Sequence, residues 1–169
     1  MNIEDYCDKL GWYLVTIPAG SKGPTSFGWQ KPERALSDPD EARKYYEQNP
    51  THNVGLLHGA SGTCAIDIDH VENTKLIFEE LGIDFSLLMN SAPQIIGREN
   101  RGKLIFKAPP DIVTHKISWP TEKDPRKNEV VFELRAGSVQ DVLPPSIHPD
   151  TGRPYEWSGM PIWDGLPEL

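Results

Sequence analysis

The chain has 169 residues, a net charge of −8 and a pI near 5.1, and this length predicts one domain that folds around its own core. Hydrophobic residues make up 37% and charged residues 25%, which excludes a disordered chain, and no apolar run reaches the length of a transmembrane helix. The acidic balance argues against a domain that grips duplex DNA by bulk charge. It leaves open an enzyme that binds nucleotides through metal ions and a few placed cations.

Cysteine usage and the N-terminus predict the compartment. Cys7 and Cys64 each stand in an apolar segment, so we expect buried thiols rather than a disulfide or a metal site. The N-terminus is acidic and lacks the basic start and apolar stretch of a signal peptide. We therefore expect a cytoplasmic protein.

The elements expected along the chain are short. Helical spacing of apolar residues predicts a helix over 1–11, a helix over 40–48 that Ser37 or Asp38 caps with Pro39 in its first turn, and a helix over 70–82 that Gly82 ends. A glycine- and proline-rich loop is expected between the first two, at 19–32. Apolar runs bounded by turn residues predict strands at 12–17, 53–59, 63–69, 93–97, 103–108, 129–137 and 139–145, and a short one at the end of 146–157.

Strands dominate, so the expected class is mixed α/β (α+β) with a largely antiparallel sheet. A Ser61–Gly62 turn separates the strands at 53–59 and 63–69, which are predicted to form a hairpin. The segments 98–102 and 121–129 are expected as loops, the second of them the most exposed part of the chain. The domain is expected to span 1–160, with 161–169 as the start of a linker.

Two aspartates in the sequence A-I-D-I-D are the first candidate site residues. Asp67 and Asp69 are two apart on a predicted strand, so they point to one face, about 7 Å apart, together with the small Ala65. Two neighbouring carboxylates on a half-buried strand favour a divalent hard cation such as Mg²⁺ or Mn²⁺. The alternative is a solvated strand end at which the aspartates cap the following helix. The opposite face takes Cys64, Ile66 and Ile68 into the core.

Glu133 is the third candidate carboxylate. It lies in another apolar strand and shares a face with Val131 and Arg135. With Asp67 and Asp69 it would complete the acid set that two-metal phosphoryl transfer needs. The alternative is a surface ion pair between Glu133 and Arg135.

Basic residues gather around the sequence G-R-E-N-R-G-K-L-I-F-K. Lys103 and Lys107 are four apart on a strand and share a face, with Arg98 and Arg101 in the loop before them. Cations beside a metal site can hold a triphosphate and offset developing charge. The alternative is a solvated edge strand on which lysine discourages aggregation.

A turn-rich segment, P-P-S-I-H-P-D-T-G-R-P-Y-E-W, contributes the last candidates. Ser146 and His148 are two apart and can share a face, and His148 is a candidate ligand for a phosphate or a sugar. The alternative for His148 is a structural role. Neither a C-x-x-C nor an H-x-x-x-H pair occurs, so no zinc site is proposed.

Together these segments resemble the primase-polymerase domain of the archaeo-eukaryotic primase superfamily, found at the N-terminus of plasmid, prophage and phage replication proteins. The resemblance begins at G-W-Y-L-V-T-I-P with Lys22 and Pro24, continues through N-V-G-L-L-H-G-A-S-G-T-C-A-I-D-I-D, and ends with the P-P-S-I-H-P segment. One departure stands out, because Lys103 occupies the place where the family's second motif usually has histidine.

The resemblance implies an RRM-like antiparallel sheet packed with a second small α/β unit, and DNA primase and polymerase activity from nucleoside triphosphates on a single-stranded DNA template. It implies metal binding by Asp67 and Asp69 and places Glu133 at the third acidic position, where the family more often has aspartate. A helicase domain is expected beyond Leu169. The candidate nucleotide-binding residues are Arg101, Lys103, Lys107, Arg135, Ser146 and His148.

Two other functions remain open at this point. The first is a catalytically weak relative that binds nucleotides or nucleic acid, which the lysine at position 103 favours. The second is a metal-dependent nuclease with the same three carboxylates. A nuclease needs no triphosphate pocket, so the basic strand with Lys103 and Lys107 argues against it.

Overall fold

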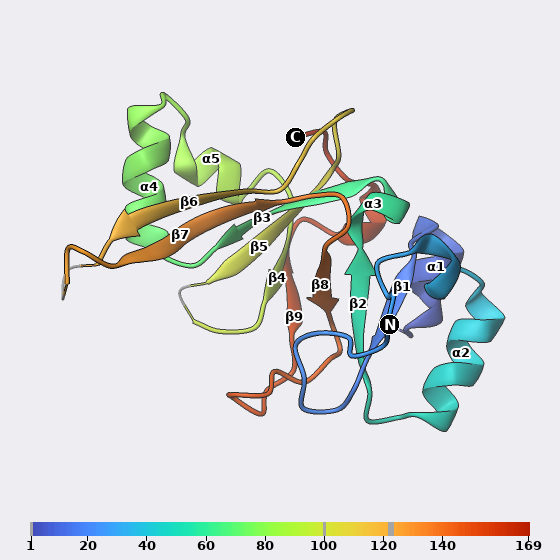
Figure 1. The fold of residues 1–169 in the computed structure, drawn as a ribbon. Helices are drawn as coiled ribbons and strands as arrows, with labels where there is room; N and C mark the ends of the chain where they lie inside the picture. The colour runs from blue at the N-terminus through green and yellow to red at the C-terminus, as the bar shows by residue number, and fades with distance from the viewer. Residues whose placement is uncertain (1, 100, 122–123) are drawn as a thin grey trace.

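A computed structural model describes residues 2–99, 101–121 and 124–169, so parts of the loops expected at 98–102 and 121–129 lie outside the described residues. Two antiparallel sheets form the fold, one of three strands and one of six (Figure 1). The chain order is α1 (Glu4–Leu10), β1 (Leu14–Ile17), η1 (Pro32–Arg34), α2 (Pro39–Gln48), β2 (Asn53–Leu57), α3 (His58–Ser61), β3 (Thr63–Ile68), α4 (Val71–Glu80), α5 (Phe85–Met89), β4 (Pro93–Ile96), β5 (Gly102–Lys107), β6 (His115–Pro120), β7 (Asn128–Arg135), β8 (Gln140–Leu143), β9 (Glu156–Gly159) and η2 (Ile162–Asp164).

The three-stranded sheet has the order β1-β2-β8, and α1 and α2 lie beside it (Figure 1). Its helices form as the sequence predicts. Asp38 caps α2 by accepting hydrogen bonds from the backbone N–H groups of Asp40 and Glu41, and Pro39 opens the first turn. Gly11 ends α1 in the left-handed conformation that glycine adopts without strain.

The six-stranded sheet has the order β6-β7-β3-β5-β4-β9, so β3 lies between β7 and β5. Helices α4 and α5 cover one of its faces (Figure 1). The expected architecture, an antiparallel sheet with a second small α/β unit, is confirmed. The central place of β3 matters for function because it puts the two aspartates between the strands that carry Glu133 and Lys103.

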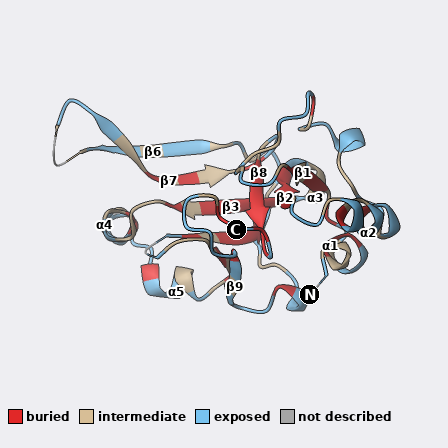
Figure 2. Cartoon of the chain, turned by 90° about the horizontal axis from the view of Figure 1, so that it is seen from below, coloured by how far each residue is buried: buried red, intermediate tan, exposed pale blue. Residues whose placement is uncertain are grey.

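Alternation along β3 divides the molecule into two cores. Cys64, Ile66 and Ile68 pack with Phe78 and Phe85 of the helices α4 and α5. Ala65, on the opposite face, belongs to the core that the smaller sheet shares. Buried residues follow β1, β2, β3 and β8, whereas β6 runs exposed along the outer edge (Figure 2). Asp67 therefore lies on the face that looks toward the smaller sheet.

The predicted hairpin of 53–59 with 63–69 is wrong. Strand β2 pairs with β1 and β8, and β3 pairs with β5 and β7, so the two strands belong to different sheets. The short helix α3 stands where a tight turn was expected and carries the chain from one sheet to the other. Strand β6 and helix α5 were not predicted, since β6 is exposed along most of its length and α5 has only five residues.

Residues 161–169, expected to begin a linker, pack on the domain. Ile162 is buried, and the ring of Trp163 stacks on Tyr6. The carbonyl of Pro167 accepts a hydrogen bond from the backbone N–H of Lys107 at 2.8 Å. These contacts fix the end of the described chain against α1 and β5.

Candidate active site

Asp67 lies between an acid and a base on one face of the larger sheet. Its register partner on β7 is Glu133 and its register partner on β5 is Lys103. Side chains directly opposite one another in an antiparallel pair share a face at close range. Asp69 follows the end of β3, where its backbone N–H donates to the carbonyl of Val131. The structure thus brings Asp67, Glu133 and Lys103 together.

Each of the three carboxylates is paired with a cation. Lys103 Nζ lies 2.8 Å from Asp67 Oδ2, and Arg101 Nη1 lies 2.8 Å from Asp69 Oδ1. Arg135 Nη1 lies 3.1 Å from Glu133 Oε2. Within 2–99, 101–121 and 124–169, no group of three or more acidic, histidine or cysteine side chains is arranged to hold a metal ion.

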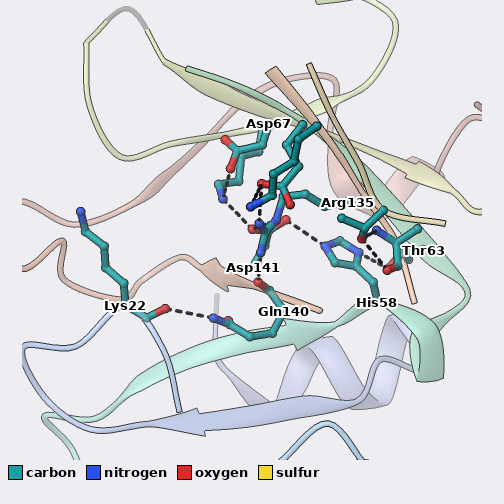
Figure 3. Close-up of polar contacts among 12 residues, drawn as sticks. Lys22, His58, Thr63, Asp67, Arg135, Gln140 and Asp141 are labelled. Carbon is teal, nitrogen blue, oxygen red and sulfur yellow. Dashed lines mark hydrogen bonds and ion pairs between the residues drawn. The ribbon is translucent and has the colours of Figure 1, made fainter. Parts of the chain in front are cut away.

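A fourth carboxylate, Asp141, reaches the same place from β8 of the smaller sheet. Lys103 Nζ lies 2.5 Å from its Oδ1, and Arg135 Nε lies 2.9 Å from the same oxygen. His58 Nε2 lies 2.9 Å from Oδ2, and the other ring nitrogen of His58 contacts Thr63 Oγ1 (Figure 3). Asp141 is 1% exposed, so a buried charge network joins the two sheets beneath Asp67.

The pKa values of Asp141 and Asp67 in this network are shifted in opposite directions. Burial alone would raise the pKa of Asp141, but Lys103, His58 and Arg135 hold that pKa well below its usual range. Burial raises the pKa of Asp67, and the charge of Asp141 adds to this effect while Lys103 opposes it. Burial would lower the pKa of Lys103, but Asp141 and Asp67 outweigh it and raise that pKa. Asp141 is therefore the firmly ionised partner of the lysine, and Asp67 is the less fully compensated acid.

Cations surround a cavity of about 180 Å³ beside the two aspartates. Gly97 lines the cavity, and a Cβ there would clash with the ring of Tyr155, so only glycine fits. The acidic, basic and histidine side chains that line it are Asp67, Asp69, Lys22, Arg98, Arg101, Lys103 and His148. We call this cavity the cationic cleft.

The mouth of the cationic cleft is organised by Asp150. Its Oδ2 lies 2.7 Å from Lys22 Nζ and 2.6 Å from an Arg98 guanidinium nitrogen. Its backbone N–H donates to Nδ1 of His148, which leaves Nε2 of the neutral ring as the N–H donor. Burial, with the nearby charges of Lys22 and Arg98, lowers the pKa of His148, which favours this neutral form.

Lys22 is held in place through its backbone. Gln140 Nε2 donates to the carbonyl of Lys22 at 2.9 Å, and the Gln140 side chain crosses β2 over Gly55 (Figure 3). A Cβ at Gly55 would clash with Gln140 Oε1, so the glycine is needed for this contact. Sequence reasoning did not assign a site role to Lys22, although this lysine lies in the glycine- and proline-rich loop and in the first segment of the family resemblance.

Four predicted site residues do not line the cationic cleft: Glu133, Lys107, Arg135 and Ser146. Lys107 is exposed and pairs with Glu168 at 3.4 Å. Ser146 is buried, and its hydroxyl bonds the backbone N–H and carbonyl of Val54, which ties β2 to the segment after β8. Arg135, predicted to bind nucleotide, is engaged with Glu133, Asp141 and the carbonyl of Gln140.

Two members of the site were missed from the sequence. Asp141 stands in an apolar strand, where a charge needs a buried partner, and this was the available signal. His58 follows directly after the apolar strand β2, but nothing in the sequence indicates that it meets Asp141, 83 residues away. Their contact depends on the antiparallel pairing of β2 with β8, which brings the end of β2 beside Asp141.

The fold consists of two antiparallel sheets, and the candidate site has acids on the central strand of one sheet and cations beside them. The profile of the family described as bifunctional DNA primase/polymerase, N-terminal, matches residues 3–169. The chain therefore belongs to the bifunctional DNA primase/polymerase N-terminal family. A search of curated proteins returned no match.

Membership gives the general activity of the family, DNA priming and polymerisation, which requires binding of nucleotides and DNA. In the part of the chain that the structure describes, no helix combines the length and the apolar character needed to cross a bilayer.

Proposed function

We propose that the cationic cleft carries out template-directed nucleotidyl transfer from nucleoside triphosphates, with Mg²⁺ or Mn²⁺ at its carboxylates. One observation supports this most. Acids of β3 and β7 stand on one sheet face, and the cleft beside Asp67 and Asp69 is lined with cations and a histidine. A triphosphate needs such cations, and a phosphoryl-transfer centre needs such acids.

The residues fit a divalent hard cation in donor type. Carboxylate oxygens are what Mg²⁺ prefers, and Mg²⁺ is usually bound through one or two carboxylates, with waters and substrate phosphates completing its shell. Asp67 would hold the ion, with Asp69 and Glu133 as its neighbours. When bound, the ion would neutralise charge on the phosphates and polarise the reacting phosphoryl group.

Three cations at the mouth are available to the triphosphate. Lys22 and Arg98 share Asp150, and Arg101 pairs with Asp69, all in exposed or half-exposed positions. Exposed ion pairs contribute little, so these side chains can exchange a carboxylate for a phosphate at small cost. The N–H of His148 Nε2 would add a neutral donor to the same anion.

A single-stranded DNA template has room beside this cleft. A groove of about 960 Å³ shares Asp69 and Arg101 with the cleft and includes the half-exposed Trp119 and Lys127. An exposed indole stacks on bases of any sequence. Acidic side chains also line this groove, so we expect weak, salt-sensitive template binding by the domain alone. A following helicase domain, expected from the family resemblance, would add DNA contacts.

A template-extension assay tests the proposal. The parent chain, with a primed or unprimed single-stranded template, should incorporate ribo- or deoxyribonucleotides when Mg²⁺ or Mn²⁺ is added. Asp67→Asn and Glu133→Gln should each abolish incorporation, because each removes a carboxylate of the site. Lys75→Ala, an exposed change on α4 at a residue that lines neither the cleft nor the groove, is the control. Equal incorporation by the parent and Asp67→Asn would refute the proposal.

One alternative has an observation in its favour. All three carboxylates already carry a cationic partner, which suits a relative that binds nucleotides without polymerising them. Such a protein would bind triphosphate with the affinity of an enzyme yet incorporate nothing at any Mn²⁺ concentration. A nuclease would instead shorten the labelled template in the same assay.

A further inference from the structure

The ammonium of Lys103 occupies the position that a cation at Asp67 would need. Nζ is 2.8 Å from Asp67 and 2.5 Å from Asp141, and the register of β3 with β5 places the lysine directly opposite Asp67. The Lys103 side chain is 22% exposed, so the ammonium is largely withdrawn from water. Charge-assisted hydrogen bonds in such surroundings are strong.

Asp67 depends on Lys103 for a direct ion pair. Among the described residues, Lys103 is the only cation within ion-pair distance of its carboxylate. Arg135 forms its ion pairs with Glu133 and Asp141 instead. Two strand positions therefore decide where the Lys103 charge lies: Asp67 on the same sheet and Asp141 on the other.

Asp141 is anchored independently of Lys103. Its second oxygen contacts His58, whose ring is held by Thr63, and its first oxygen also meets Arg135. A carboxylate fixed in this way sets the position of the lysine rather than following it. Because the contact crosses between the two sheets, Asp141 holds the Lys103 ammonium against β3 from the opposite side of the site.

We propose that Lys103 is the resident counter-cation of Asp67, that Asp141 positions it there, and that a divalent ion reaches Asp67 by exchange with this ammonium. This rests on the proposed function in placing the divalent ion at Asp67. The displaced ammonium keeps its ion pair with Asp141. Because Lys103 lines the cationic cleft, another N–H of the ammonium can donate a hydrogen bond to a phosphate there. Metal binding by the nucleotide-free protein is then weak, because the ion must break an existing ion pair.

Mn²⁺ binding by the nucleotide-free full chain, followed by calorimetry at constant pH, tests the exchange. Lys103→Met should bind Mn²⁺ at least about tenfold more tightly than the parent, since a competing charge-assisted contact is gone. Lys103→Arg keeps the charge and should bind as weakly as the parent. Lys107→Met, on the same face of β5 but paired with Glu168, is the matched control and should match the parent. Equal or weaker Mn²⁺ binding by Lys103→Met overturns the proposal.

A spectroscopic arm follows the ammonium directly. The side-chain N–H₃⁺ resonance of a lysine held in two ion pairs is protected from solvent exchange and is observable by NMR. Mg²⁺ should shift the Lys103 resonance and leave that of Lys107 unchanged. Asp141→Asn should broaden the Lys103 resonance without metal. A Lys103 resonance that changes neither with Mg²⁺ nor in Asp141→Asn contradicts the proposed role of Lys103. The Mg²⁺ titration uses the parent chain, so this test holds even if a variant folds poorly.

The two proposals fail separately. If the parent shows no polymerisation, and Lys103→Met nevertheless binds Mn²⁺ more tightly than the parent, the exchange is supported and the proposed activity is refuted. If the parent polymerises and Lys103→Met leaves Mn²⁺ affinity unchanged, the activity stands and the exchange falls.

Discussion

Asp141 and Asp150 organise the two ends of one site with the same kind of contact, yet the contacts have different consequences. Each carboxylate meets a lysine and an arginine, Lys103 and Arg135 at the buried end and Lys22 and Arg98 at the mouth. Asp141 is 1% exposed, whereas Asp150 is 52% exposed. When a buried ion pair is broken, the remaining charge has neither a partner nor water around it. When an exposed pair is broken, both groups are solvated by water. The buried end therefore fixes geometry, and the mouth is free to exchange partners.

The largest effect is expected for Asp141→Asn. Removing this charge leaves Lys103 and Arg135 under-compensated between the sheets, so the free energy of unfolding should fall by about 3 kcal/mol or more. Urea denaturation at neutral pH measures it. Asp150→Asn is the comparison and should leave the denaturation midpoint unchanged. If the two variants behave alike, the distinction between the buried end and the mouth fails.

A smaller effect on binding is expected at the mouth. The double variant Lys22→Ala, Arg98→Ala should lose at least about tenfold in triphosphate affinity, because charge-assisted contacts to phosphate are removed. The loss should be smaller for the monophosphate and should shrink at high salt. Fluorescence titration with a labelled nucleotide gives the affinities. Stability should stay at the parent value, and an unchanged triphosphate affinity would show that the mouth does not bind phosphate.

The smallest effect concerns Asp67→Asn in the absence of metal. Because the folded state raises the pKa of Asp67, ionising this group opposes folding. The parent should therefore lose stability as pH rises through that raised pKa, and Asp67→Asn should be slightly more stable than the parent at pH 7. The gap should close as pH falls below 3.8, where the parent carboxyl becomes protonated in both states. Denaturation midpoints at several pH values test the sign, and a variant less stable at pH 7 would reverse it.

The local parts of this fold can be predicted from the sequence because short-range patterns fix them. Asp38 and Pro39 mark the start of α2, and alternation in β3 separates Asp67 from Ile66 and Ile68. The same alternation in β7 puts Glu133 and Arg135 on one face. These patterns are enough to make Asp67 and Glu133 candidates for one site.

Long-range arrangement cannot be predicted in the same way. The hairpin prediction for 53–59 and 63–69 assumed that strands close in sequence pair with each other. In the structure β2 pairs with β8 in one sheet, and β3 pairs with β7 in the other. Asp141 was missed for the same reason, since its partners Lys103 and His58 lie 38 and 83 residues away. Contacts between segments so distant in sequence depend on strand pairing and packing that no local pattern encodes.

The central claim is that Asp67 lies where a divalent ion and a triphosphate meet. Crystallography with bound Mn²⁺ as an anomalous scatterer tests this claim most directly. Crystals grown with Mn²⁺ and a non-hydrolysable deoxynucleoside triphosphate should show anomalous density within about 2.2 Å of an Asp67 oxygen. The phosphates should lie in the cleft beside Lys22 and His148, and the Lys103 ammonium should have left Asp67 for a phosphate. A bound triphosphate with Lys103 still on Asp67 and no manganese there would contradict the account.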